Sequence, residues 1–108
     1  MGIEDRRHER IEVAIQVRVS GRDQDGRLIE ESTLSGDISL SGCAVLLARY
    51  LDGGTELDLR FLCPVREGQE PRVLSFRGAV VRSTPMNEAQ YIVGIQFLNG
   101  SFPMDALR

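Results

Sequence analysis

A short segment near the N-terminus contains the residue types needed to bind an anion. Residues 6–10 read Arg-Arg-His-Glu-Arg, which places the guanidinium groups of Arg6, Arg7 and Arg10 close together in the chain. An arginine fork pairs bidentately with phosphate, and it matches the O6 and N7 acceptors of guanine with a discrimination of about 1–3 kcal/mol. Arg6 and Arg10 lie on one side of an extended chain or of a helical turn, so two forks can close on one ligand. The alternative interpretation is a solvated arm whose arginines pair weakly with neighbouring carboxylates.

Residues 37–42, which read Asp-Ile-Ser-Leu-Ser-Gly, form a second candidate ligand-binding segment. The carboxylate of Asp37 can accept hydrogen bonds from the two N–H groups on the Watson–Crick edge of guanine. Ser39 offers a hydroxyl to a phosphate, a ribose or a base, and Gly42 permits a positive φ or a close approach of the backbone to a ligand. The alternative is ordinary turn chemistry, in which Asp and Ser side chains cap backbone groups. Taken together, the two segments predict a binding site for a guanine nucleotide.

The composition argues against several other functions. The chain has 108 residues, which is the size of one domain and leaves little room for a deep active site. It contains one histidine, and no nucleophile–base pair or metal-binding motif is evident. We therefore expect no catalytic residues, no metal, no cofactor and no enzymatic activity. The net charge of −3 argues against a protein that binds nucleic-acid polymers, because such proteins are normally basic.

The sequence also bears on compartment and on the two cysteines. Charged residues begin at Glu4 with no apolar core after them, and no apolar run approaches the ~18 residues of a membrane span. We therefore expect a cytoplasmic protein without membrane insertion. Cys43 and Cys63 lack metal-site spacing and are expected to be buried, reduced thiols, with a disulfide between them as the open alternative.

The hydrophobic pattern predicts an all-β fold. Six segments show either period-two alternation or a short apolar run, and turns rich in Gly, Pro and Asp separate them. Gly78, inside the fifth segment, predicts a bulge or a close backbone approach. About six antiparallel strands indicate a sandwich or a barrel, and a barrel is favoured because closure removes exposed strand edges. The expected strands are residues 11–19, 27–33, 43–48, 57–62, 73–82 and 91–97.

The chain ends are expected to lie outside the strands. No long segment shows helical periodicity, and the tail can form at most a short helical turn near Ser101 and Pro103. The expected organisation is an N-terminal arginine arm at residues 1–10, a barrel at 11–99 and a tail at 100–108. A polar arm without an apolar anchor should be mobile until a ligand organises its arginines.

The two segments, in this order on an all-β chain of this size, resemble the paired signature of the PilZ domain family. That family carries an Arg-x-x-x-Arg pattern near its N-terminus, filled here by Arg6 and Arg10, with Arg7 as an additional basic residue. The resemblance covers roughly residues 5–99 and includes the segments 78–82 and 93–97. The second family pattern, [D/N]-x-S-x-x-G, is filled by Asp37, Ser39 and Gly42.

The resemblance implies a PilZ-type β-barrel that binds cyclic di-GMP, a bacterial second messenger, without catalysis. It implies that the three arginines contact phosphates and guanine bases, that Asp37 reads a guanine edge, that Ser39 supports the site and that Gly42 shapes the turn. It also implies an arm that wraps over the ligand, and an output protein in motility, secretion, polysaccharide synthesis or transcription. The alternative is a PilZ-fold protein-interaction adaptor that does not bind the nucleotide. Binding of the ligand as a monomer or as an intercalated dimer is left open.

Overall fold

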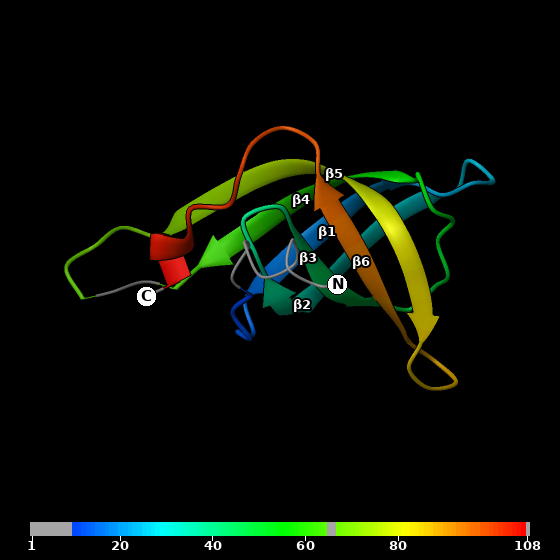
Figure 1. Cartoon of the computed structure of the whole chain (residues 1–108), viewed down its shortest axis with the longest axis horizontal. Helices are drawn as coiled ribbons and strands as arrows, with labels where there is room; N and C mark the ends of the chain where they lie inside the picture. Colours follow the sequence, from blue (N-terminus) through cyan, green and yellow to red (C-terminus); the bar gives the residue numbers. More distant parts are fainter. Residues whose placement is uncertain (1–9, 65–66, 108) are drawn as a thin grey trace, which may run out of the picture.

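Six antiparallel strands close into a barrel, as the sequence predicts (Figure 1). The computed structural model describes residues 10–64 and 67–107. Its elements are β1 (Gln16–Arg22), β2 (Leu28–Ile38), β3 (Gly42–Leu47), β4 (Glu56–Cys63), β5 (Arg72–Pro85), β6 (Tyr91–Phe97) and the short 3-10 helix η2 (Met104–Leu107). The predicted barrel and the short C-terminal helical turn are confirmed, whereas the predicted arm lies, except for Arg10, outside the described residues. Among the described residues, no helix combines the length and the apolar character of a membrane span.

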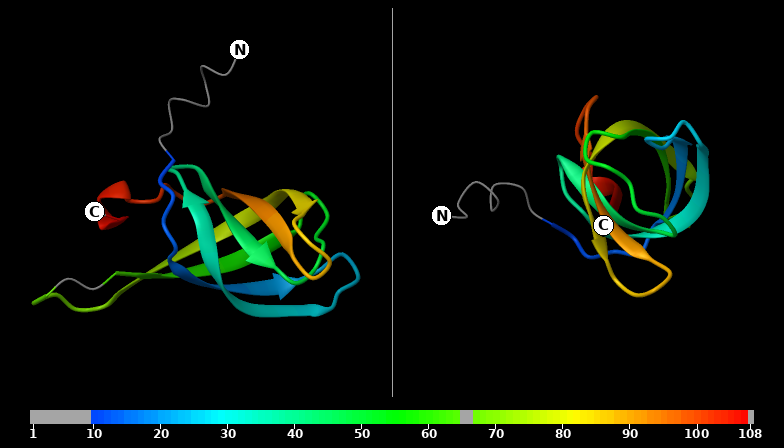
Figure 2. Two further views of the ribbon diagram at one scale, coloured as in Figure 1. Left: turned by 90° about the horizontal axis from the view of Figure 1, so that it is seen from below. Right: turned by 90° about the vertical axis from the view of Figure 1, so that its right-hand side faces the viewer.

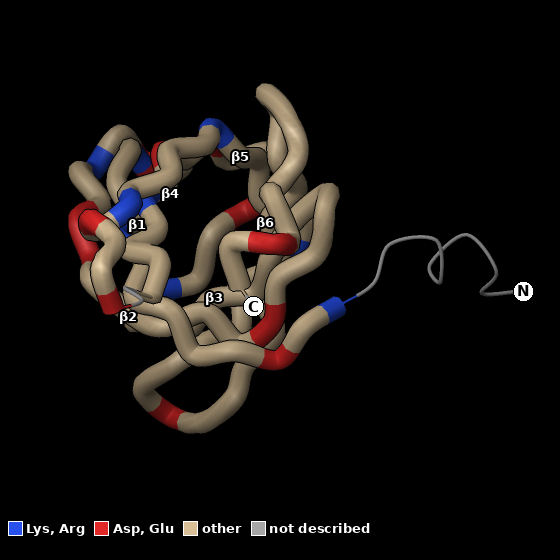
Figure 3. The backbone as a smooth tube through the Cα atoms, turned by 90° about the vertical axis from the view of Figure 1, so that its left-hand side faces the viewer, with Lys and Arg blue, Asp and Glu red and all other residues tan. Residues whose placement is uncertain are grey.

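The barrel consists of two consecutive three-stranded meanders. β1, β2 and β3 form the first, and β4, β5 and β6 form the second. Two pairings between distant parts of the chain join them, β1 with β4 and β3 with β6, and we call these the β1–β4 seam and the β3–β6 seam. The closed strand order is β1-β2-β3-β6-β5-β4, which places the two seams on opposite sides of the barrel. The views along the barrel in Figures 2 and 3 show this ring of strands.

Inward-facing apolar side chains fill the barrel because successive residues of a strand point to opposite faces. β4 shows this most regularly, since Leu57, Leu59 and Phe61 are buried whereas Asp58 and Arg60, which alternate with them, are exposed. The period-two pattern in the sequence therefore identifies the core face of this strand correctly.

A cluster of phenylalanines, to which the tail contributes, lies in the core. Phe102 is fully buried, and its ring centroid lies 5.2 Å from that of Phe61, 5.6 Å from that of Phe76 and 6.3 Å from that of Phe97. The backbone amide of Phe102 also donates a hydrogen bond to the carbonyl of Leu40 at 3.0 Å. Figure 2 shows η2, which follows this residue, at one end of the barrel. The tail is therefore anchored chiefly through Phe102, and the partly buried Met104, Ala106 and Leu107 also pack against the core.

β1 begins later than the sequence predicts. Ile11, the predicted first residue, forms only an isolated bridge with Ile38, with N–O distances of 2.9 and 3.0 Å. Between this bridge and β1, the backbone amide of Ser35 donates to the carbonyl of Ile15 at 2.9 Å, and its buried side chain satisfies two further backbone groups. Its hydroxyl donates to the carbonyl of Val13 at 2.8 Å and accepts from the amide of Ile15 at 3.2 Å. Residues 11–15 therefore lie beside β2 without extending β1.

β2 and β5 are both longer than predicted. β2 continues past the predicted end at Thr33, because an irregularity in register just before Asp37 keeps the strand paired with β3. Asp37, which was expected in a turn, therefore lies in a strand. β5 continues to Pro85 past a second irregularity after Val80, so the predicted loop at 83–90 is shorter.

Two predictions about small buried residues are confirmed. A Cβ atom on Gly78 would collide with the side chain of Ile95 in β6, so the glycine marks a close approach between β5 and β6. Cys43 and Cys63 are both buried and free, so the disulfide alternative is wrong.

Candidate functional site

A groove of about 520 Å³ crosses the outer face of the barrel over the β3–β6 seam. One cross-strand row forms its floor, in which Asp37 of β2 lies opposite Ala44 of β3. Ala44 lies opposite Gly94 of β6, and Gly94 lies opposite Arg82 of β5. Neighbouring strands are about 4.8 Å apart, so the row spans roughly 14 Å from β2 to β5. Its middle carries almost no side chain, whereas its two ends carry opposite charges.

The structure brings together most of the residues that the sequence singles out. Four of them line the groove: Arg10, Asp37, Ser39 and Gly42. The other two, Arg6 and Arg7, precede Arg10 in the chain and lie outside the described residues. Among the described residues, Arg10 of the first segment and the three predicted residues of the second therefore line one groove.

The bridge between Ile11 and Ile38 positions Arg10. Its two backbone hydrogen bonds fasten Ile11 to the last residue of β2. Because Asp37 and Ser39 are the sequence neighbours of Ile38, this bridge brings Arg10 to the same end of the groove. A single backbone contact thus connects the end of the arginine segment to the Asp-x-Ser-x-x-Gly segment.

Ser39 shapes the turn between β2 and β3. Only 8% of the residue is exposed, and its hydroxyl donates to the carbonyl of Gly42 and accepts from the amide of Ser41, both at 3.3 Å. The backbone amide of Ser39 donates to the same Gly42 carbonyl at 2.8 Å. These bonds hold together the ends of the turn that borders the groove.

Gly42 is required by the packing of the β3–β6 seam. The sequence predicts either a positive φ or a close backbone approach to a ligand at this position, and the first alternative is wrong because its φ is not positive. A Cβ atom at this position would instead collide with the backbone carbonyl oxygen of Ile95 in β6. The adjacent carbonyl of Ser41 accepts a hydrogen bond from the amide of Phe97 at 2.8 Å, which fixes the same close approach. The close approach seen here is to the backbone of β6, and the approach of a ligand to Gly42 stays a prediction.

Sequence reasoning missed the polar residues that β5 and β6 contribute to the groove. Arg82, Thr84 and Gln96 line it together with the predicted residues. Neither Arg10 nor Arg82 forms an ion pair with any described residue. Both guanidinium groups are therefore available to an anion. The available sequence signal was an arginine directly after the apolar segment 79–81, but nothing in its spacing connects it to Asp37.

Cys43 lies next to Gly42 but faces the core. Burial, and to a smaller extent the charge of Asp37, raises the pKa of its thiol to about 12. The thiol is therefore protonated at neutral pH and is a poor nucleophile. In residues 10–64 and 67–107, no group of three or more His, Cys, Asp or Glu residues is placed to hold a metal ion. The groove thus offers hydrogen-bonding and charged groups suited to binding.

Comparisons with known proteins bear on the family and the fold of the chain. A family model described as the PilZ domain matches residues 4–107. The solved structure of the Bacillus subtilis inhibitor of motility MotI/DgrA is 22% identical and superposes on 96% of this chain with a TM-score of 0.69. Escherichia coli YcgR in complex with c-di-GMP is 21% identical, with a TM-score of 0.60 over 93% of this chain. The K. pneumonia MrkH–c-di-GMP complex is 18% identical, with a TM-score of 0.59 over 93%.

These likenesses establish a shared fold. This chain covers 46% of the MotI/DgrA structure, 40% of the YcgR structure and 46% of the MrkH structure, so each of those proteins is about twice as long. No curated protein sequence matches the chain significantly.

Proposed function

The chain belongs to the PilZ domain family, and on that premise we propose that it is a receptor for cyclic di-GMP that binds this ligand in the groove over the β3–β6 seam. The observation that carries the proposal is the cross-strand row with Asp37 at one end, Arg82 at the other and a bare floor between them. Two of the solved structures that share the fold, YcgR and MrkH, are complexes with c-di-GMP. Because their sequence identities to this chain are low, these two complexes support only the class of ligand. The location of the binding site is argued from the groove itself.

The chemistry of the groove matches the ligand, which carries two guanines and two phosphates. Asp37 accepts hydrogen bonds from the N–H groups of one guanine, while Arg10, together with Arg6 and Arg7, binds phosphates and the O6 and N7 acceptors of a base. Arg82 supplies a further cationic fork across the floor. Because the floor residues are Ala and Gly, a flat base can lie against the backbone of the seam.

In this proposal the arginine segment, residues 1–10, changes its conformation when the ligand binds. Residues 1–10 belong to the site, residues 11–99 form the barrel and residues 100–108 form the tail. Ligand binding reorders residues 1–10 and thereby changes the contact with an output protein. The module is non-catalytic and cytoplasmic, and its output partner belongs to motility, secretion, polysaccharide synthesis or transcription.

Isothermal titration calorimetry with cyclic di-GMP tests the proposal, with GTP and cyclic GMP as control ligands. We expect saturable binding of cyclic di-GMP alone, and the stoichiometry will show whether it binds as a monomer or as an intercalated dimer. Arg10→Ala, Asp37→Ala and Arg82→Ala each remove a hydrogen bond to a charged group, worth about 1.5–3 kcal/mol. Each should therefore weaken binding roughly 10- to 150-fold.

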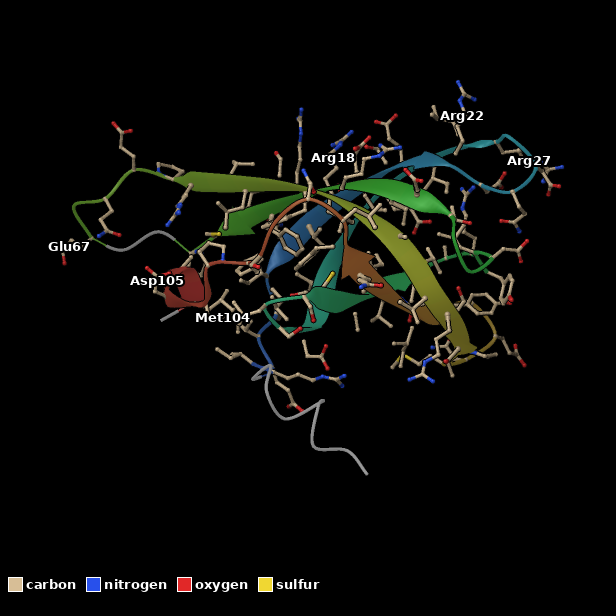
Figure 4. The ribbon with its side chains drawn as sticks, turned by 45° about the horizontal axis from the view of Figure 1, so that its top comes forward. Arg18, Arg22, Arg27, Glu67, Met104 and Asp105 are labelled. Carbon is tan, nitrogen blue, oxygen red and sulfur yellow. The ribbon has the colours of Figure 1, made fainter. Side chains whose placement is uncertain are left out.

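Arg27→Ala is the matched control, because Arg27 is an exposed arginine at the β1–β2 hairpin, far from the groove (Figure 4). It should bind like the wild type, and all variants should keep the wild-type thermal unfolding transition. A flat titration with folded wild-type protein would reject the receptor function and leave the protein-interaction adaptor. Wild-type affinity in Arg10→Ala and Asp37→Ala would reject the assigned site.

A further inference from the structure

A second hollow, of about 590 Å³, lies over the β1–β4 seam and extends onto β5. Outward-facing side chains line it, including those of Arg18, Asp58, Arg60 and Arg77. Figure 4 shows Arg18 pointing away from the barrel. Because the two seams lie on opposite sides of the barrel, this hollow shares no lining residue with the proposed nucleotide groove.

Two of the three arginines in this hollow are held in ion pairs. Arg18 pairs with Glu30 at 2.7 Å, and Arg77 pairs with Glu56 and Asp58, each at 3.0 Å. The hydrogen bond to Asp58, and after it the one to Glu56, raises the pKa of the Arg77 guanidinium above its ordinary value.

Arg60 is the arginine that remains. It lies directly opposite Arg18 across the β1–β4 seam and opposite Ser75 of β5. It forms no ion pair with any residue in the described part of the chain. Like charges placed directly opposite in a sheet destabilise it. An external carboxylate would therefore give Arg60 the ion-pair partner that it lacks among the described residues.

An exposed apolar row lies immediately beside this arginine. Leu62, two residues after Arg60, lies opposite Val73 of β5, and Leu34 of β2 continues the row on the far side of Gln16. Leu34 and Leu62 are each 48% exposed and Val73 is 53% exposed. Two residues along a strand correspond to about 7 Å, so one bound segment can reach both the apolar row and Arg60.

We propose that this face, formed by Leu34, Arg60, Leu62 and Val73, docks a partner protein through a segment that presents a carboxylate beside apolar side chains. Leu62 and Val73 are adjacent exposed apolar residues beside charged neighbours, which is typical of protein-interaction sites, and arginine is enriched in interfaces. The carboxylate pairs with the free Arg60 fork while the apolar side chains of the partner cover Leu62 and Val73. We call this surface the docking face.

Fluorescence anisotropy with a labelled peptide, Gly-Ser-Leu-Glu-Leu-Glu-Leu-Ser-Gly, tests the docking face on the full chain. We expect saturable binding to the wild type and weak or no binding of the same peptide with Lys in place of Glu. Arg60→Glu should weaken binding of the Glu peptide at least tenfold and strengthen binding of the Lys peptide. Leu62→Ser should also weaken binding of the Glu peptide. Arg27→Glu, a charge reversal of the same kind at an exposed arginine outside the face, should change neither.

Cyclic di-GMP binding separates this proposal from the proposed function. Arg60→Glu and Leu62→Ser should bind cyclic di-GMP like the wild type, which also shows that they fold. Absence of Glu-peptide binding to the wild type, equal binding of the two peptides, or unchanged binding in Arg60→Glu would overturn the docking face. A wild-type dimer in sedimentation velocity that Leu62→Ser dissociates would overturn it too, because the face would then belong to a second copy of the chain.

Discussion

Gly42 links the proposed binding site to the closure of the barrel. Gly42→Ala would place a methyl group against the carbonyl oxygen of Ile95, a backbone atom held by the pairing of β3 with β6. Overpacking of this kind costs about 1–3 kcal/mol or more, because strands rather than side chains must move. We therefore expect a clear loss in the free energy of unfolding, measured by urea denaturation.

Gly36→Ala is the matched control for this prediction. Gly36 lies within β2, at the irregularity in its register with β3, and a Cβ atom there would be 3.8 Å from the carbonyl oxygen of Ala44, which is ordinary contact. Its unfolding free energy should stay close to the wild-type value. If Gly42→Ala were as stable as Gly36→Ala, the close approach at the β3–β6 seam would not be limiting.

The buried thiol of Cys43 makes stability depend on alkaline pH. Its pKa is raised from 9.0 to about 12, chiefly by burial and further by Asp37. Between these two pH values the unfolded chain loses a proton that the folded chain keeps, so stability falls as pH rises and is intact below pH 9. Urea denaturation across this pH range should show a steeper decline for the wild type than for Cys43→Ala. Parallel declines would contradict the assignment to this thiol.

At the residue scale, the sequence predicts those site residues that belong to one local segment. The residue types and spacing at 37–42 indicate a ligand site, and the structure places Asp37, Ser39 and Gly42 around one groove. Arg82 escapes such reasoning because it reaches the groove only through the pairing of β5 with β6, and an irregularity after Val80 sets that register. Contacts between distant strands carry no spacing signal in one sequence.

At the scale of elements, Ser35 controls how the segment before β1 lies beside β2. Ser35→Ala removes the hydrogen bonds to Val13 and Ile15 and leaves both backbone groups without that partner. An unsatisfied buried polar group costs about 1–3 kcal/mol, so we expect a comparable loss of stability by urea denaturation. We also expect weaker cyclic di-GMP binding by calorimetry, because the segment that carries Arg10 is held less firmly.

Ser32→Ala provides the comparison on the same strand. Ser32 is exposed in β2, where the substitution should change stability by less than about 0.5 kcal/mol. It should leave ligand affinity unchanged. Equal ligand affinity in Ser35→Ala and Ser32→Ala would mean that the Ser35 hydrogen bonds do not position Arg10.

Strands with regular alternation were predicted best. The predicted bounds of β6 agree with the structure, and the prediction for β4 fails only at its ends. The unbroken alternation of residues 11–15 predicts that they belong to β1. The backbone of β2 pairs only with Ile11 and Ile15, however, and the Ser35 hydroxyl satisfies the Val13 carbonyl and the Ile15 amide. A hydrophobic pattern reports which side chains face the core, and it does not report which backbone groups find a strand to pair with.

At the scale of the whole molecule, the tail completes the core of the barrel. Phe102→Ala should remove a fully buried ring that packs against three other phenylalanines. Such truncations cost about 3–5 kcal/mol, so the thermal unfolding transition should fall strongly. Leu98→Ala, at a 52% exposed position nearby in the chain, should leave the transition almost unchanged. A small effect of Phe102→Ala would show that the barrel does not depend on its tail.

The division of the barrel into two meanders has a kinetic consequence. Each meander pairs strands that are neighbours in sequence, whereas the seams pair distant residues such as Gly42 with Gln96, and such contacts form slowly. In the proposed site, Asp37 comes from the first meander and Arg82 from the second, so a chain whose seams are still open offers the ligand no complete site. Bound cyclic di-GMP should therefore slow unfolding in stopped-flow experiments while leaving the refolding rate unchanged. The concentration of the messenger would then set the lifetime of the folded barrel, while the rate at which the barrel forms would not depend on it.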